Sequence, residues 1–182
     1  MSYEALENWL NMDFLRKVPE EKRGLVPTYP ALTLGLHVAG KGAQIGSVAG
    51  LGLTTLTAVA CTLVRRKRPQ AWKIIMVPST IVGTSFTCAM LYFKHMNNEL
   101  DDAAVDDRAQ RIANNTEQIK TDRYSLAGFS IGAVLGVIAG QNIAAMSCTG
   151  IAAGVLFYFA EREKNDAKKR KAMEVFNPRR EE

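Results

Sequence analysis

Charged residues are unevenly spread along the chain and leave three long uncharged runs. Residues 43–64 form a run of 22 residues without a charged side chain, residues 74–93 form a run of 20, and residues 124–160 form a run of 37. About 20 apolar residues are enough to cross a bilayer as a helix. The first two runs therefore each predict one transmembrane helix, whereas the third run is too long for a single span.

The third run contains one polar turn, at residues 140–142, where the sequence reads Gly-Gln-Asn. Such a tripeptide is typical of a break between two helices. It divides the run into helices at 124–140 and 143–160, which are both short and suit a thin or locally thinned bilayer. We therefore expect an all-α membrane protein with four short transmembrane helices in two hairpins.

Glycine recurs every fourth residue in the first and third predicted spans. These glycines are Gly42, Gly46, Gly50, Gly128, Gly132, Gly136 and Gly140. In water each interior glycine costs a helix about 1 kcal/mol relative to alanine. In lipid the backbone must be hydrogen-bonded internally, and glycines four residues apart form a smooth face where another helix can approach closely. The pattern predicts glycine-zipper packing, with the glycine faces of spans one and three as the contact between the two halves.

The region before the first span is also apolar, from residue 31 to residue 40, and it contains His37. Joined to residues 43–64 it would make a helix of about 50 Å at 1.5 Å per residue, longer than a bilayer is thick. We therefore expect a break or an interface crossing near residues 40–42, which read Gly-Lys-Gly. His37 has no partner at metal-ligand spacing, so we interpret it as a packing or interface residue.

Three segments are polar and are predicted to lie outside the membrane bundle of residues 31–160. Residues 1–30 form an extramembrane N-terminal segment, whose apolar face around Trp9 suits either a membrane interface or a partner protein. Residues 94–123 form a loop with seven acidic and five basic residues and a helical apolar seam. Residues 161–182 form a charged tail with eight basic and six acidic residues. We expect amphipathic extramembrane helices in these segments.

The first loop is strongly basic and carries the orientation signal. Its five cations, without an acidic residue among them, are Arg65, Arg66, Lys67, Arg68 and Lys73. Short basic loops stay on the cytoplasmic side in bacteria and on the matrix side in mitochondria. The loop is either a topology signal alone or, in addition, a contact for anionic lipid head groups such as cardiolipin. With four spans, both termini and the loop at 94–123 lie on the opposite side.

The composition argues against several functional classes. The net charge is +5, but the basic residues are split among tails and loops without a nucleic-acid-binding motif, so we expect no nucleic-acid partner. Cys61, Cys88 and Cys148 all fall inside predicted spans without metal-site or disulfide spacing. The sequence shows no nucleophile and base set, no metal cluster and no nucleotide-binding loop. We therefore expect no enzymatic activity and no cofactor other than a bound phospholipid.

A short motif precedes the second glycine array. The run from Lys120 through Asp122 to Ser125 leads directly into the glycines of span three. The chain resembles the mitochondrial inner-membrane Tim-type four-helix family, which carries a Lys-x-Asp-x-x-Asn element at this point. Lys120 and Asp122 match that element, and Ser125 stands in place of the asparagine. The resemblance covers about residues 40–160, and it implies a multi-pass protein with its termini in the intermembrane space and the loop at 65–73 in the matrix.

That family includes protein-import translocases and an accessory subunit of the respiratory complex I membrane arm. The charged extensions at both ends and the long loop at 94–123 depart from the import subunits and favour the second branch. We therefore expect a non-catalytic accessory subunit of mitochondrial NADH:ubiquinone oxidoreductase that stabilises the membrane arm or a supercomplex contact. Its partners would be other membrane-arm subunits and phospholipid. The alternative is a component of an inner-membrane protein translocase.

Overall fold

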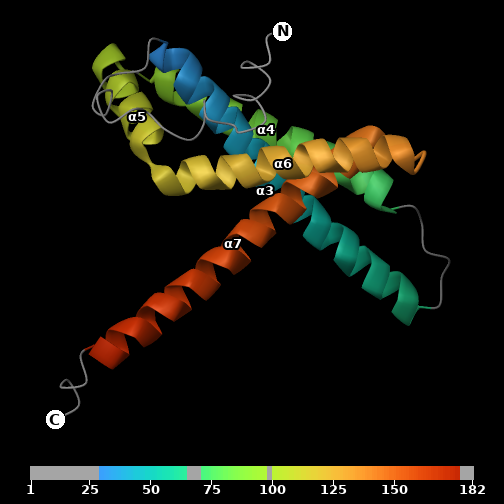
Figure 1. Ribbon diagram of the computed structural model, residues 1–182. Coiled ribbons are helices and arrows are strands. Elements are labelled where there is room, and N and C mark those ends of the chain that lie inside the picture. The colour runs from blue at the N-terminus through green and yellow to red at the C-terminus, as the bar shows by residue number, and fades with distance from the viewer. Residues whose placement is uncertain (1–28, 65–70, 98–99, 177–182) are drawn as a thin grey trace, which may run out of the picture.

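The structure is a computed structural model that describes residues 29–64, 71–97 and 100–176. These residues form five α-helices and no strand, which confirms the prediction of an all-α chain. The helices are α3 (Pro30–Leu63), α4 (Ala71–Met96), α5 (Asp102–Asn114), α6 (Thr116–Ile138) and α7 (Ile143–Phe176) (Figure 1). The predicted N-terminal segment lies outside the described residues up to residue 28, and so does the end of the tail at 177–182.

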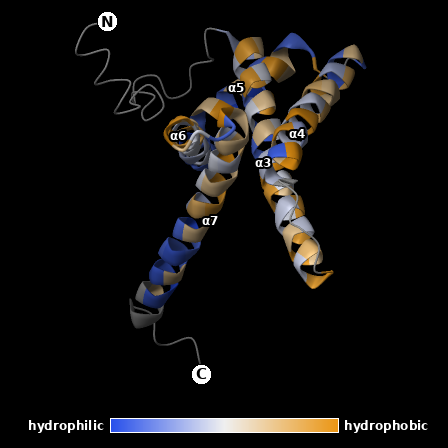
Figure 2. Cartoon of the chain, turned by 90° about the vertical axis from the view of Figure 1, so that its right-hand side faces the viewer, coloured by the Kyte–Doolittle hydropathy of each residue, from blue (hydrophilic) through white to orange (hydrophobic). Residues whose placement is uncertain are grey.

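Among the described residues, three helices are long and apolar enough to cross a membrane, namely α3, α4 and α7. Most side chains in their apolar windows are not buried by the rest of the chain. Exposed apolar helices of this length belong in lipid, because water would not tolerate so much uncovered apolar surface. The chain is therefore a helical protein with the character of a membrane protein, and Figure 2 shows that hydrophilic residues gather in the C-terminal part of α7.

The helices form two antiparallel pairs, α3 with α4 and α6 with α7 (Figure 1). Helix α7 also touches α3 and α4, so that it brings the second pair against the first. The short helix α5 packs on α3 near the start of the bundle, where Leu34, Leu100 and Ala109 are buried. Helix α5 covers only part of the first turns of α3, because Leu32 and Leu36 in the same turns remain exposed.

Helix α3 runs for 34 residues without interruption, so the expected helix break at residues 40–42 is wrong. Gly40 and Gly42 both remain helical, because internal backbone hydrogen bonds outweigh the propensity cost of two glycines. The alternative expectation, an interface crossing at Lys41, stays a prediction. The side chain of Lys41 contacts Asp122 on α6.

Helix α6 begins at Thr116, so the predicted loop at 94–123 contains the end of α4, all of α5 and the first two turns of α6. A side-chain cap explains where α5 begins and another explains where α6 begins. The Asp101 carboxylate accepts a hydrogen bond from the Ala104 amide at 2.8 Å, and the Asn115 side chain accepts one from the Gln118 amide at 3.2 Å. Each cap satisfies an amide that the first turn of a helix leaves unpaired.

The turn between α6 and α7 falls at residues 139–142. Gly140 has φ +59°, the left-handed conformation that glycine adopts without strain. The Gln141 amide donates to the Gly136 carbonyl at 2.9 Å, and the Gly140 amide donates to the Val137 carbonyl at 3.2 Å. These two bonds form a Schellman motif that ends α6. The Asn142 side chain then accepts the Ala145 amide at 3.0 Å and begins α7.

Candidate functional site

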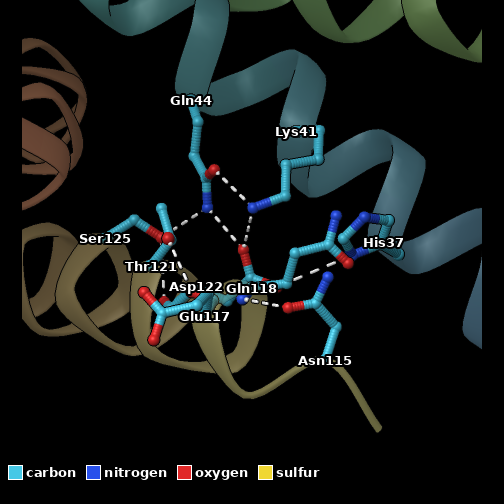
Figure 3. Close-up of polar contacts among 9 residues, drawn as sticks. All are labelled: His37, Lys41, Gln44, Asn115, Glu117, Gln118, Thr121, Asp122 and Ser125. Atoms are coloured by element: carbon cyan, nitrogen blue, oxygen red, sulfur yellow. Dashed lines mark hydrogen bonds and ion pairs between the residues drawn. The ribbon is translucent and has the colours of Figure 1, made fainter. Parts of the chain in front are cut away.

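A polar network connects α3 of the first helix pair to α6 of the second (Figure 3). We call it the polar latch, and its members are His37, Lys41, Gln44, Asp122 and Ser125. The three α3 residues lie at spacings of four and three, and the two α6 residues lie three apart. Helical residues three or four apart share a face, so each helix presents its polar residues to the other as one row.

The Asp122 carboxylate is the centre of the latch. Lys41 Nζ donates to Asp122 Oδ1 at 2.8 Å, and Gln44 Nε2 donates to the same oxygen at 2.7 Å. His37 Nδ1 lies 3.6 Å from Asp122 Oδ2. The whole α3 row therefore converges on one acidic side chain of α6.

Two further bonds close the network. Gln44 Nε2 lies within 2.9 Å of Ser125 Oγ, which itself donates to the Asp122 carbonyl at 2.8 Å. Lys41 Nζ also donates to Gln44 Oε1 at 3.0 Å. Gln44 and Ser125 are buried, and buried polar groups of this kind are costly unless they are paired. The latch thus satisfies polar groups that would otherwise oppose the approach of the two helix pairs.

The latch also sets the ionisation of Asp122. Partial burial by itself raises the pKa of this carboxyl, but the hydrogen bonds from His37, Lys41 and Gln44 outweigh burial and hold the pKa below its ordinary value. Asp122 is therefore ionised at neutral pH, and its negative charge faces the ammonium group of Lys41. This is a charge-assisted contact, which is stronger than a hydrogen bond between neutral groups.

Only two of the three motif residues that precede the second glycine array belong to the latch. Asp122 and Ser125 belong to the latch, whereas Lys120 Nζ lies 3.4 Å from Glu117 Oε1 on an exposed part of α6. The sequence did not identify Lys41 and Gln44 as their partners. One signal was present, because Lys41 is the only charged residue between 31 and 64, and such a residue usually pairs with another polar group.

A second polar group lies between α6 and α7. The hydroxyl of Tyr158 donates to Glu117 Oε2, and Arg162 Nε lies 3.8 Å from the same oxygen. The hydrogen bond from Tyr158 is the main reason why the pKa of Glu117 lies below its ordinary value, with Lys120 adding to it. The hydroxyl of Tyr124 donates to Glu161 in the same region. These contacts hold α7 against the first turns of α6.

The glycines of residues 42–50 face α4. A Cβ atom at Gly42 would overlap the Gly83 carbonyl, a Cβ atom at Gly46 would overlap the Ser79 carbonyl, and one at Gly50 would lie 2.9 Å from Ser79 Cβ. A side chain at Gly83 would in turn lie 2.5 Å from the Gly42 carbonyl oxygen. The backbones of α3 and α4 therefore approach closely where both helices carry glycine.

The glycines of residues 128–136 face α7. Gly128 and Gly150 lie against each other, so that a Cβ atom on either would overlap the carbonyl of the other. A Cβ atom at Gly132 would overlap the Met146 carbonyl, and one at Gly136 would lie 3.0 Å from Ile143 Cα. The expectation that the two glycine faces meet each other is wrong, because each face is used within its own hairpin.

Gly140 has a different role from the other six predicted packing glycines. A Cβ atom there would meet no described atom within 4 Å. Its φ of +59° serves the turn after α6, so its assignment to helix packing is wrong. Of the basic loop, Arg65, Arg66, Lys67 and Arg68 lie outside the described residues. Lys73 lies in the first turn of α4, with its Nζ 5.4 Å from the centre of the Trp72 ring.

One family model covers most of the chain. A family model described as a protein of unknown function (DUF1757) matches residues 13–156. The matched part includes α3 to α6, both sides of the polar latch and the first turns of α7. No curated protein matches the sequence.

Proposed function

We propose a structural role in a membrane complex for this chain, which belongs to the DUF1757 family of proteins of unknown function. The observation that carries the proposal is the polar latch. All five of its side chains are directed at one another across the junction of two helix pairs. A catalytic carboxylate has to reach a substrate, whereas Asp122 has its oxygens committed to Lys41, Gln44 and His37.

The bundle is proposed to cross the membrane four times. Helix α6 carries charges in its first two turns and is uncharged from Tyr124 to Ile138, so its second part is the fourth span. The glycine contacts within each pair then act as glycine zippers, because close backbone packing is what favours helix association in lipid. In Figure 1 the end of α3 and the turn between α6 and α7 lie toward the same side, which supports two hairpins inserted in the same direction.

The membrane is proposed to be the mitochondrial inner membrane, with the basic residues 65–73 in the matrix and both termini in the intermembrane space. Fusion of a peptide tag to the C-terminus tests this orientation. Protease added to mitochondria with a ruptured outer membrane should remove the tag, and protease added to intact mitochondria should not. A tag that is cleaved only after the inner membrane is dissolved would contradict the proposed orientation.

The complex is proposed to be NADH:ubiquinone oxidoreductase, in which the chain acts as a non-catalytic accessory subunit of the membrane arm. Two features support this role. The chain resembles the Tim-type family at Lys120 and Asp122, and Asp122 is the centre of the polar latch. In addition, nearly all side chains of residues 161–171 in α7 are exposed, and this part of the helix extends away from the bundle (Figure 1), as an arm for a neighbouring subunit would.

A second candidate is a component of an inner-membrane protein translocase. The observation in its favour is an open apolar groove between α3, α6 and α7, with a volume of about 620 Å³. A segment of a precursor protein in transit would pass along such a surface. This candidate shares the fold, the membrane and the orientation with the first one, and it differs in the partners that the chain should contact.

Native electrophoresis separates the two candidates. Mitochondria that carry the tagged full-length chain are solubilised gently and resolved on a native gel, which is stained for NADH dehydrogenase activity and probed for the tag. Comigration of the tag with the activity is the expected result. Migration in a complex without this activity, together with crosslinks to precursor proteins, would refute the complex I assignment and favour the translocase.

A further inference from the structure

Two adjoining hollows are lined by residues of α6 and α7. The first is the apolar groove of about 620 Å³ between α3, α6 and α7. The second is a polar hollow of about 510 Å³ between the first turns of α6 and the charged part of α7. Glu117, Tyr158 and Arg162 line both of them, so the two hollows adjoin along these three residues.

The walls of the groove are apolar and uncovered. Ile45 and Ala49 from α3 face Leu156 and Phe159 from α7 across it. Ile45 is 62% exposed, Phe159 is 51% exposed and Leu156 is 47% exposed. Large apolar side chains that converge on one hollow and remain this exposed indicate an apolar occupant.

The polarity of the groove changes along its length in the same direction on both walls. On α3 the lining begins at Lys41 and Gln44 and becomes apolar from Ile45 to Ala49. On α7 it begins at Arg162 and becomes apolar toward Val155. Eight residues of helix separate Lys41 from Ala49, which is about 12 Å at 1.5 Å per residue. Four polar side chains at the start of α6 also line the groove, namely Asn115, Glu117, Gln118 and Thr121, and Figure 3 shows them close to Asp122.

The charge of the polar end is positive. Five basic residues line the two hollows, namely Lys41, Lys120, Arg123, Arg162 and Lys169. Three acidic residues line them, namely Glu117, Glu161 and Asp166. Lys41 is already paired with Asp122, which lines neither hollow. The polar hollow itself has four of the basic residues and all three acidic ones, and this excess of one positive charge favours an anionic head group. An occupant that matches both hollows has a negative head group and an apolar chain.

We propose that an anionic phospholipid binds here, with its phosphate head group in the polar hollow beside Arg162 and Lys169 and one acyl chain in the groove along Ile45, Ala49 and Phe159. The site is distinct in sequence from the basic residues 65–73, for which a lipid contact was predicted from composition. It requires the chain to lie in a membrane, but it does not depend on the complex to which the chain belongs. Failure of the complex I assignment would therefore leave this proposal standing, and failure of lipid binding would leave the complex I assignment standing.

The test measures lipid binding to the purified full-length chain. The chain is delipidated in a neutral detergent and titrated with phosphatidylglycerol, and the bound lipid is counted by native mass spectrometry. Phosphatidylcholine with the same acyl chains tests the charge of the head group. Glycerol phosphate, which lacks the acyl chains, tests whether a free phosphate compound accounts for the binding.

Two pairs of variants locate the site. Ala49→Phe fills the groove with a ring and should weaken phosphatidylglycerol binding about tenfold, since overfilled sites lose about this much. Ala60→Phe places the same ring on an exposed position of α3 outside the groove and should leave binding unchanged. Lys169→Gln should weaken binding about fivefold, the amount expected for one cation near an anionic lipid. Lys168→Gln removes a neighbouring exposed cation that does not line the polar hollow and should have no effect.

Each outcome decides the proposal. The expected result is one phosphatidylglycerol held in preference to phosphatidylcholine, with binding weakened in Ala49→Phe and in Lys169→Gln but in neither control. Equal binding of the two lipids, or equal loss in Ala49→Phe and Ala60→Phe, would show ordinary contact with surrounding lipid and overturn it. Equal binding of glycerol phosphate would show an anion site without an acyl chain. Because Lys169 is exposed, its variant remains informative if Ala49→Phe does not fold.

Discussion

Removal of the Asp122 carboxylate is the most direct test of the polar latch. In Asp122→Ala the ammonium group of Lys41 and the amide of Gln44 lose the oxygen that both contact, at 2.8 Å and 2.7 Å. Gln44 is buried, and the Lys41 side chain is only 25% exposed. Water can therefore replace the lost partner only in part, and the variant should be less stable.

The expected magnitude lies between two limits. Breaking a fully buried ion pair costs about 3–5 kcal/mol, whereas an exposed pair contributes about 1 kcal/mol or less. The Asp122 side chain is 36% exposed, so a loss of about 2 kcal/mol in the free energy of unfolding is expected from one charge-assisted contact and one buried amide. For a chain of this length that loss lowers the melting temperature by roughly 4–8 °C.

Asp107→Ala is the matched control. Asp107 Oδ2 lies 2.9 Å from Arg111 Nη2, so it also loses an ion pair, but both side chains are exposed and both lie on α5. The expected loss is only about 0.3–0.5 kcal/mol. Thermal unfolding of the full-length chain in one detergent at pH 7 compares the two variants with the wild type.

A double-mutant cycle with Lys41→Met isolates the interaction across the two helix pairs. Coupling of about 1 kcal/mol or more between positions 41 and 122 is expected, because the two residues share a direct contact. Equal melting temperatures for Asp122→Ala and Asp107→Ala, or a coupling energy near zero, would refute the role of the latch in joining the two pairs.

Three other predictions use the same melting assay. Gly128→Ala should lower the free energy of unfolding by about 1–3 kcal/mol, since its Cβ would overlap the Gly150 carbonyl. Gly52→Ala is the control and should be neutral or stabilising, because its Cβ would meet no described atom within 4 Å. A similar loss of stability in both variants would argue against the close contact between α6 and α7. The folded state lowers the pKa of Asp122 below 3.8, so the ionised carboxylate should stabilise the fold by a constant amount at neutral pH, and this stabilisation should be lost as the pH falls through the folded-state pKa. The difference in melting temperature between the wild type and Asp122→Asn should therefore close below about pH 4. A difference that widens there would contradict this sign. Gly140→Ala should lower the free energy of unfolding by about 1–2 kcal/mol, because φ is +59° at this position, and Gly140→Asn should lower it less. Equal stability of the wild type and both variants would show that the turn relaxes.

The helical elements of this chain were predictable because their causes are local. Uncharged runs of about 20 residues, the polar turn at 140–142 and the charged tail can all be recognised without knowledge of the fold. Exact bounds were less predictable, since α3 continues through Gly40 and Gly42 and α6 begins at Thr116. In α3 the internal backbone hydrogen bonds outweigh the cost of the glycines, and the Asn115 cap begins α6 before its uncharged part.

The pairing of surfaces could not be predicted from local patterns. A glycine every fourth residue shows that something approaches closely, but it does not specify which helix, because a face without side chains fits many partners. The structure places α4 on the glycines of α3 and α7 on those of α6. Between the halves, α7 packs against α3 and α4, and the polar latch joins α3 to α6 at residues that glycine periodicity does not mark.

The sequence by itself determined that the chain is helical, that it carries long uncharged runs and that Lys41 stands alone among apolar residues. Only the tertiary structure decided that Lys41 and Gln44 meet Asp122, which lies 81 and 78 residues further along the chain. The physical reason is that helix formation and burial follow from the periodicity of nearby residues, whereas a hydrogen bond between distant side chains depends on how two complete helix pairs cross. The polar latch and the groove beside it are properties of that crossing.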